Sequence, residues 1–137
     1  MDETFVTLSI NKFLNENNYQ VIQCIPPGGQ GGINFTVKNK IIYPDIICMK
    51  NEVLFIGENK PLFDESDETK LCNLSLENNL YSIAQNIVDN FFKSEKKSTL
   101  KINNIKFFLG FSIKSKKISN KLLNMLVDSN GLVILKN

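Results

Sequence analysis

The chain has 137 residues, of which 42% are hydrophobic and 22% charged, and this composition excludes a disordered chain and predicts a single domain over residues 1–137. It contains no histidine, which excludes histidine-dependent catalytic triads and histidine metal sites, and its odd number of cysteines, three, favours free thiols in a cytoplasmic protein. No apolar run approaches the length of a membrane span and the first ten residues are acidic, so we expect neither membrane association nor a secretory signal.

The net charge of +2 conceals an uneven distribution along the chain. All 16 basic residues are lysine, and arginine is absent. Residues 1–92 carry 6 lysines against 12 acidic residues, whereas residues 93–137 carry 10 lysines against 2 acidic residues. A basic C-terminal part predicts contact with a polyanion, and a solvated lysine-rich face is the alternative. The lysines that we expect at this contact are Lys93, Lys96, Lys97, Lys114, Lys116 and Lys117.

The first part of the chain predicts a helix, a strand and a glycine-rich loop. Residues 2–17 repeat apolar side chains at helical spacing, and the acidic residues at their start suit a helix N-terminus. Residues 19–25 are typical of a strand, which the segment 26–32, rich in proline and glycine, then ends. Residues 33–38 predict a further short strand. No Gly-Lys-Ser/Thr follows the glycines, so the loop is not a Walker phosphate-binding motif.

Residues 41–60 predict a β-hairpin around which the rest of the chain is organised. The runs 41–49 and 53–59 are apolar and rich in β-branched residues and phenylalanine, which favours strands. The polar residues between the two runs are typical of a tight turn. Both runs carry apolar side chains on both faces, so we expect the sheet to be covered on each side.

The rest of the chain predicts further helices and strands. Residues 61–70 form an acidic loop that keeps the region soluble, with a solvated lid as the alternative. Beyond it we expect a helix at 76–93, a lysine-rich loop at 94–104, a strand at 105–113, a short helix at 118–127 and a strand at 131–135. The predicted order is therefore α-β-β-β-α-β-α-β.

The hairpin register brings two acidic residues together. A two-residue turn at 51–52 pairs the residues on either side of it, and counting outwards places Asp45 opposite Glu58. Lys60, two residues further on, points to the same face. Two carboxylates about 4 Å apart repel by roughly 4 kcal/mol at an effective dielectric near 20. A divalent cation such as Mg²⁺ or Mn²⁺ would offset both charges, whereas a salt-bridged hairpin with one carboxylate in solvent is the alternative.

These residues resemble a known signature. Pro44-Asp45 on one strand and Glu58-Asn59-Lys60 on the next resemble the motif of the PD-(D/E)XK nuclease superfamily, and the predicted order of elements is similar to its restriction-endonuclease-like αβββαβ core. The resemblance implies an α/β fold with a central mixed sheet flanked by helices. It also implies that Asp45, Glu58 and the backbone carbonyl of Asn59 hold Mg²⁺ (or Mn²⁺), while Lys60 orients or deprotonates the attacking water.

The same resemblance suggests further site residues. Many members of the superfamily carry an acidic residue on the first helix that is aimed at the metal, and Glu3 is the candidate here, with Glu16 the alternative. Some place a glutamine on a later helix, for which Gln85 is the candidate, although the tyrosine expected four residues later is replaced by Asp89. The glycine-rich loop is similar in position to a loop beside the active site of archaeal Holliday-junction resolvases, but it lacks their basic residues.

The expected activity is metal-dependent endonucleolytic hydrolysis of duplex or branched DNA. Because arginine is absent, we expect recognition through phosphates and shape more than through base edges. One small site cuts one strand, so a homodimer is compatible with cleavage of both. The alternative function is a catalytically silent module of the same fold that binds DNA or a protein partner.

Overall fold

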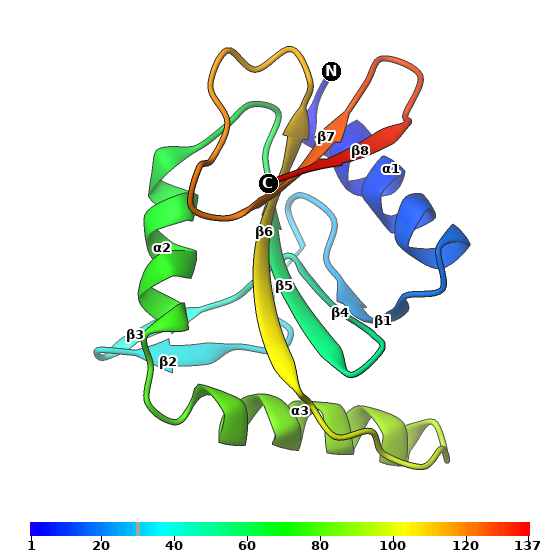
Figure 1. Cartoon of the computed structure of the whole chain (residues 1–137), viewed down its shortest axis with the longest axis vertical. Helices are drawn as coiled ribbons and strands as arrows, with labels where there is room; N and C mark the ends of the chain where they lie inside the picture. Colours follow the sequence, from blue (N-terminus) through cyan, green and yellow to red (C-terminus); the bar gives the residue numbers. More distant parts are fainter. Residues whose placement is uncertain (30) are drawn as a thin grey trace.

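The computed structural model describes residues 1–29 and 31–137, and over these residues the chain forms an α/β fold. Three helices accompany a six-stranded mixed sheet and a separate two-stranded hairpin in the described residues (Figure 1). The helices are α1 (Glu3–Glu16), α2 (Glu65–Ser75) and α3 (Leu80–Ser94). The strands are β1 (Gln20–Cys24), β2 (Phe35–Val37), β3 (Lys40–Ile42), β4 (Ile46–Lys50), β5 (Val53–Asn59), β6 (Asn104–Ser112), β7 (Leu123–Val127) and β8 (Val133–Lys136).

The six strands lie in the order β1-β4-β5-β6-β7-β8. The pairs β5–β6 and β6–β7 are parallel, and the other neighbours are antiparallel. The predicted hairpin register is confirmed, because Lys50 pairs with Val53 across the turn. Asn51 and Glu52 in this turn both have positive φ, at 51° and 67°, which a tight two-residue hairpin turn requires.

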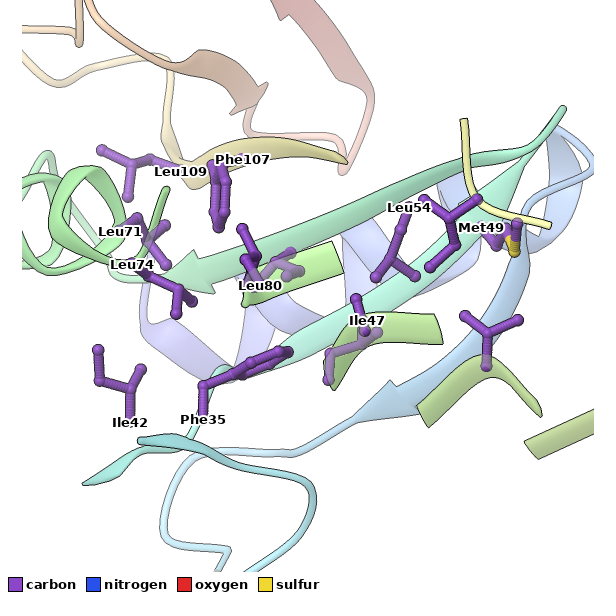
Figure 2. Packing of buried hydrophobic residues seen from close by; sticks show 14 of the residues in the cluster. Phe35, Ile42, Ile47, Met49, Leu54, Leu71, Leu74, Leu80, Phe107 and Leu109 are labelled. Carbon is purple, nitrogen blue, oxygen red and sulfur yellow. The ribbon is translucent and has the colours of Figure 1, made fainter. Parts of the chain in front are cut away.

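Helices cover both faces of the large sheet, as the sequence predicts. On one face α1 buries Val6, Ile10 and Leu14 against the sheet, next to Phe108 of β6. On the other face α2 and α3 pack on a larger apolar cluster, part of which Figure 2 shows. The β2–β3 hairpin closes one side of that cluster with Phe35. The two faces therefore bury β4, β5 and β6 almost completely, and only their ends reach solvent.

The helix predicted at residues 118–127 is wrong. Residues 123–127 form β7, which runs parallel to β6 and is buried along most of its length. A short apolar run of this kind is typical of a strand covered on both faces, and periodicity alone does not separate it from a buried helix. The Asn124 side chain fixes the preceding loop, since it accepts a hydrogen bond from the Ser119 N–H at 2.8 Å and donates one to the Ser119 carbonyl at 2.8 Å.

The acidic loop predicted at residues 61–70 is also wrong over its second half. Residues 65–75 form α2, which Asp64 caps by accepting hydrogen bonds from the backbone N–H groups of Ser66 and Asp67. Acidic residues in a first turn are favoured by the helix dipole, so their density here marks a helix start and not a soluble loop.

Other boundaries shift without changing the topology. The run predicted as one strand at 41–49 is interrupted at residues 43–45, which separates β3 from β4. The helix expected at 76–93 begins at Leu80. The helix predicted at 2–17 and the strands predicted at 19–25, 53–59 and 105–113 are confirmed within two residues. No helix within the described residues is long and apolar enough to cross a membrane.

Candidate active site

The structure brings Asp45 and Glu58 into contact at one end of the β4–β5 hairpin. Asp45 precedes β4, directly beyond the last ladder pair, Ile46 with Gly57. Its Oδ2 atom accepts a hydrogen bond from the Asn59 N–H at 2.8 Å, and its carboxyl group lies close enough to that of Glu58 to raise the pKa of Glu58. The predicted juxtaposition of the two carboxyl groups is therefore present in the structure.

The backbone around Asp45 is held by β1. The Ile25 N–H donates to the Asp45 carbonyl at 2.8 Å. Gln23 donates its side-chain amide to the Pro44 carbonyl at 3.0 Å and accepts from the Ile33 N–H at 2.7 Å. The end of β1 thus holds the Pro44-Asp45 peptide through Gln23 and Ile25, and Ile33 in turn holds the Gln23 side chain. Gln30 of the glycine-rich segment lies outside the described residues.

Glu58 meets a cation that the sequence prediction missed. The Lys70 ammonium on α2 contacts the Glu58 carboxylate and lies 3.7 Å from Asp67 Oδ1. The Glu58 side chain is only 4% exposed, whereas that of Lys70 is 34% exposed. Asp67, Lys70, Leu71 and Leu74 follow the i, i+3, i+4, i+7 spacing of one helix face. This spacing is the sequence signal for Asp67 and Lys70, and it is recognised only when residues 61–70 are taken as the start of a helix.

Burial shapes the protonation of this cluster. Desolvation, followed by the hydrogen bond and negative charge of Asp45, raises the pKa of Glu58 from 4.5 to about 8, against the opposing charge of Lys70. Desolvation also raises the pKa of Asp67, with the two nearby ammonium groups, Lys70 and Lys60, opposing it. Burial lowers the pKa of Lys70, but its contact with Glu58 outweighs that effect, so the net shift is upward.

Two buried carboxylate oxygens of the cluster accept no hydrogen bond from the described residues. They are Glu58 Oε1 and Asp67 Oδ2. Glu58 Oε1 nevertheless faces the Lys70 ammonium as an ion pair, whereas Asp67 Oδ2 has no partner among the described residues. A buried carboxylate oxygen is costly without a partner, so Asp67 Oδ2 marks a place where a cation would be stabilised.

Glu3 lies close enough to Asp45 and Lys60 for both charges to affect its pKa. Glu3 begins α1, and its pKa is raised by partial burial and by the charges of Asp45 and Asp67, while Lys60 opposes the rise. Lys60 follows the end of β5, donates its backbone N–H to the Gly110 carbonyl at 2.9 Å and is close enough to lower the pKa of Asp64. The alternative candidate, Glu16, is exposed at the other end of α1 and lies 3.8 Å from Lys12.

Gln85 is not brought to this cluster. Its amide donates to Asp89 and to the Leu100 carbonyl, both at 2.9 Å, and its oxygen accepts from the Ile102 N–H at 2.8 Å. These partners precede the start of β6, whereas Glu58 lies opposite Leu109 near the end of that strand. Gln85 thus anchors the loop between α3 and β6.

The six lysines expected to contact a polyanion fall into two groups. Lys114, Lys116 and Lys117 lie in the segment after β6, at the same end of the sheet as Glu58, and Lys117 is 3.9 Å from Glu65. Lys93, Lys96 and Lys97 lie at the end of α3 and in the loop after it, at the opposite end, where the chain returns to the β4–β5 turn (Figure 1). The six expected lysines therefore lie at two opposite ends of the sheet.

A metal ion is compatible with these residues. No group of three or more acidic or cysteine side chains converges as a metal site within residues 1–29 and 31–137. Mg²⁺, however, commonly takes only one or two protein carboxylates and keeps several waters. Asp45 and Glu58 supply two, and the Asn59 carbonyl faces the same side as its N–H, toward Asp45. A metal ion at Glu58 would share or displace the Lys70 ammonium, which already contacts Oε1.

Comparisons with protein-family models, with curated proteins and with solved structures found no match for this chain. The functional argument therefore depends on its own residues and their geometry.

The raised pKa of Glu58 predicts a pH-dependent stability in EDTA. Between pH 4.5 and about 8, Glu58 is protonated in the folded chain and ionised in the unfolded chain. Its contribution to the free energy of unfolding is therefore full below pH 4.5 and is lost as pH rises through 8. Thermal melts from pH 5 to 9 should show a fall in wild-type melting temperature that is reduced in Glu58→Gln. The matched control Glu16→Gln, at an exposed site, should keep the wild-type slope, and equal slopes in all three proteins would contradict the shift.

Proposed function

We propose that the protein is a metal-dependent endodeoxyribonuclease of the PD-(D/E)XK type. The observation that carries this proposal is the contact between Asp45 and Glu58 across the hairpin. The Asn59 N–H donates a hydrogen bond to Asp45, and Lys60 directly follows Asn59 in the sequence. Support also comes from the mixed sheet with helices on both faces, which agrees with the fold that the resemblance implies.

In the proposed mechanism, Asp45, Glu58 and the Asn59 carbonyl would hold Mg²⁺. The ion would supply positive charge that polarises a phosphodiester and acidifies a bound water. Lys60 is partly exposed and free of ion pairs in the described part of the chain, so its ammonium is available to orient the attacking water and to stabilise charge on the phosphate. Glu3 adds a carboxylate whose pKa the positive charge of Lys60 lowers, so the two groups attract each other across a distance.

DNA would reach these residues over the end of the sheet that bears them. Lys114 lines a hollow of about 380 Å³ together with Pro61 and Leu62, directly after Lys60. Lys117 lies over the ring of Phe63, 5.5 Å from its centroid. Lys116 belongs to the same exposed segment. These ammonium groups suit phosphate contacts, which position a duplex without reading its sequence.

Cleavage assays test the proposal directly. Purified protein incubated with supercoiled plasmid and with a branched DNA junction should nick one of them in Mg²⁺ or Mn²⁺ and neither in EDTA. Wild-type melting temperature should rise in millimolar Mg²⁺, because a ligand that binds only the folded state stabilises it. Asp45→Asn should lose both the nicking and the Mg²⁺-dependent shift, while the surface control Glu52→Gln keeps both.

A second candidate function is a silent module that binds DNA without cutting it. The ion pair between Lys70 and Glu58 favours it, since this cation already neutralises the buried carboxylate. If the wild-type protein binds DNA but cuts none of the substrates with either metal, the silent module is the better account and the nuclease proposal is wrong.

A further inference from the structure

A second hollow lies next to the carboxyl cluster, between the β2–β3 hairpin and α2. Figure 1 shows the hairpin beside this helix, and the hollow between them has a volume of about 350 Å³. This volume is in the range of small-ligand sites. Polar and basic side chains from both elements reach it, and they are Lys38, Lys40, Ser66, Thr69, Lys70 and Asn73.

The charges around this pocket are unbalanced. Lys38 and Lys40 form no ion pair with any residue in the described ranges. Lys70 brings a third ammonium, which also contacts the Glu58 carboxylate and lies 3.7 Å from Asp67 Oδ1. Thr69 and Asn73 add neutral hydrogen-bond donors. Among the described residues no acidic side chain lines the pocket, and Val37, Ile41 and Ile42 form its apolar wall. The polar part of this lining fits a small, multiply hydrogen-bonded anion.

We infer that the pocket binds a phosphate group of a nucleic-acid chain, one that neighbours the phosphate to be cut. This inference rests on the proposed nuclease function and extends it. Lys70 links the two places, because it lines the pocket and also contacts Glu58. A phosphate held by Lys38, Lys40 and Lys70 would therefore lie one side chain away from the carboxyl pair. Ammonium groups bind phosphates as point charges, which suits backbone contacts without base readout.

The hairpin geometry supports a specific test. Lys38 and Asn39 form its turn with positive φ, at 47° and 67°. Asparagine tolerates the left-handed region, so Lys38→Asn removes the charge without adding backbone strain. The pocket variant Lys38→Asn/Lys40→Gln is compared with the control Lys12→Gln/Lys50→Gln, which removes the same charge from two lysines outside both the pocket and the basic C-terminal part.

Binding of a fluorescent 12-base-pair duplex would be measured in EDTA across a salt series. We expect the pocket variant to bind about tenfold more weakly than wild type, and the control to stay within about twofold. The salt slope should fall by about 1.8 in the pocket variant, since two phosphate contacts are lost. Melting curves establish that each variant is folded, and Lys40→Gln alone gives the same comparison if the double variant is not.

Competitors distinguish the sources of the anion. Inorganic pyrophosphate should displace the duplex from wild type only weakly, and a glutamate decapeptide should not displace it. An equal loss in both variants, or no loss in either, would overturn the pocket. If pyrophosphate binds tightly to wild type and not to the pocket variant, while duplex affinity is unchanged, the pocket is a site for a small phosphate compound. If the glutamate peptide binds in a pocket-dependent way, the pocket is a site for a protein partner. Because EDTA prevents cutting, failure to cleave in Mg²⁺ would remove the nuclease proposal but not the pocket result.

Discussion

Replacement of Lys60 by alanine is expected to slow DNA nicking by about 10²- to 10⁴-fold while leaving DNA affinity within about twofold, since a positioned proton-transfer group contributes that much to rate. Lys60 directly follows β5, two residues after Glu58, but it is one positive charge among 16. Its loss therefore removes chemistry and little binding. Single-turnover nicking in Mg²⁺ and duplex binding in EDTA measure the two effects separately.

The control for this variant is Lys12→Ala, which removes an exposed ammonium on α1 that pairs with Glu16. It should nick at the wild-type rate. Normal cutting by Lys60→Ala would show that the assignment of this lysine is wrong even in an active nuclease. A parallel loss of affinity and rate would place Lys60 in DNA binding instead.

Replacement of Lys70 by methionine is expected to destabilise the fold by about 1–3 kcal/mol at pH 9 and by much less at pH 6. Lys70 is one-third exposed, so water replaces part of its contact and the cost stays below that of breaking a fully buried pair. At pH 6 Glu58 is mostly protonated, because its pKa is about 8, and needs no cation. At pH 9 the wild type keeps an ion pair that the variant lacks.

Chemical denaturation at the two pH values measures the difference. The double variant Lys70→Met/Glu58→Gln should recover most of the stability at pH 9, since neither charge is then left alone. Equal destabilisation at both pH values would mean that Lys70 acts through packing of its aliphatic stem. A Lys70→Met protein as stable as wild type at pH 9 would show that the ion pair contributes nothing.

The hairpin and its acidic pair could be predicted because local chemistry determines them. The turn residues Asn51 and Glu52 fix the register, and a fixed register places Asp45 next to Glu58. These relations depend on residues close together in sequence. The apolar face of α1, and hence the place of Glu3 at its start, follow in the same way from helical spacing.

The parts that were missed depend on tertiary context. β7 is a strand because it pairs with β6, and the residues of 118–127 alone do not indicate this pairing. Lys70 becomes part of the site because α2 packs across the end of β5, a contact between distant segments. The many acidic residues of 61–70 favour an exposed loop, because acidic side chains are mostly exposed in proteins. In the structure Asp67 and Glu68 are buried on α2 instead.

The parallel pairing of β5 with β6 has a consequence for folding kinetics. The β4–β5 hairpin is closed by a two-residue turn and forms early, whereas β6 joins β5 only after the long connection that contains α2 and α3 has been ordered. During that interval Asp45 and Glu58 already face each other, and Lys70 has not arrived. The early hairpin therefore carries repulsion between two carboxylates, and the opposing charge of Lys70 reaches them only once α2 has packed.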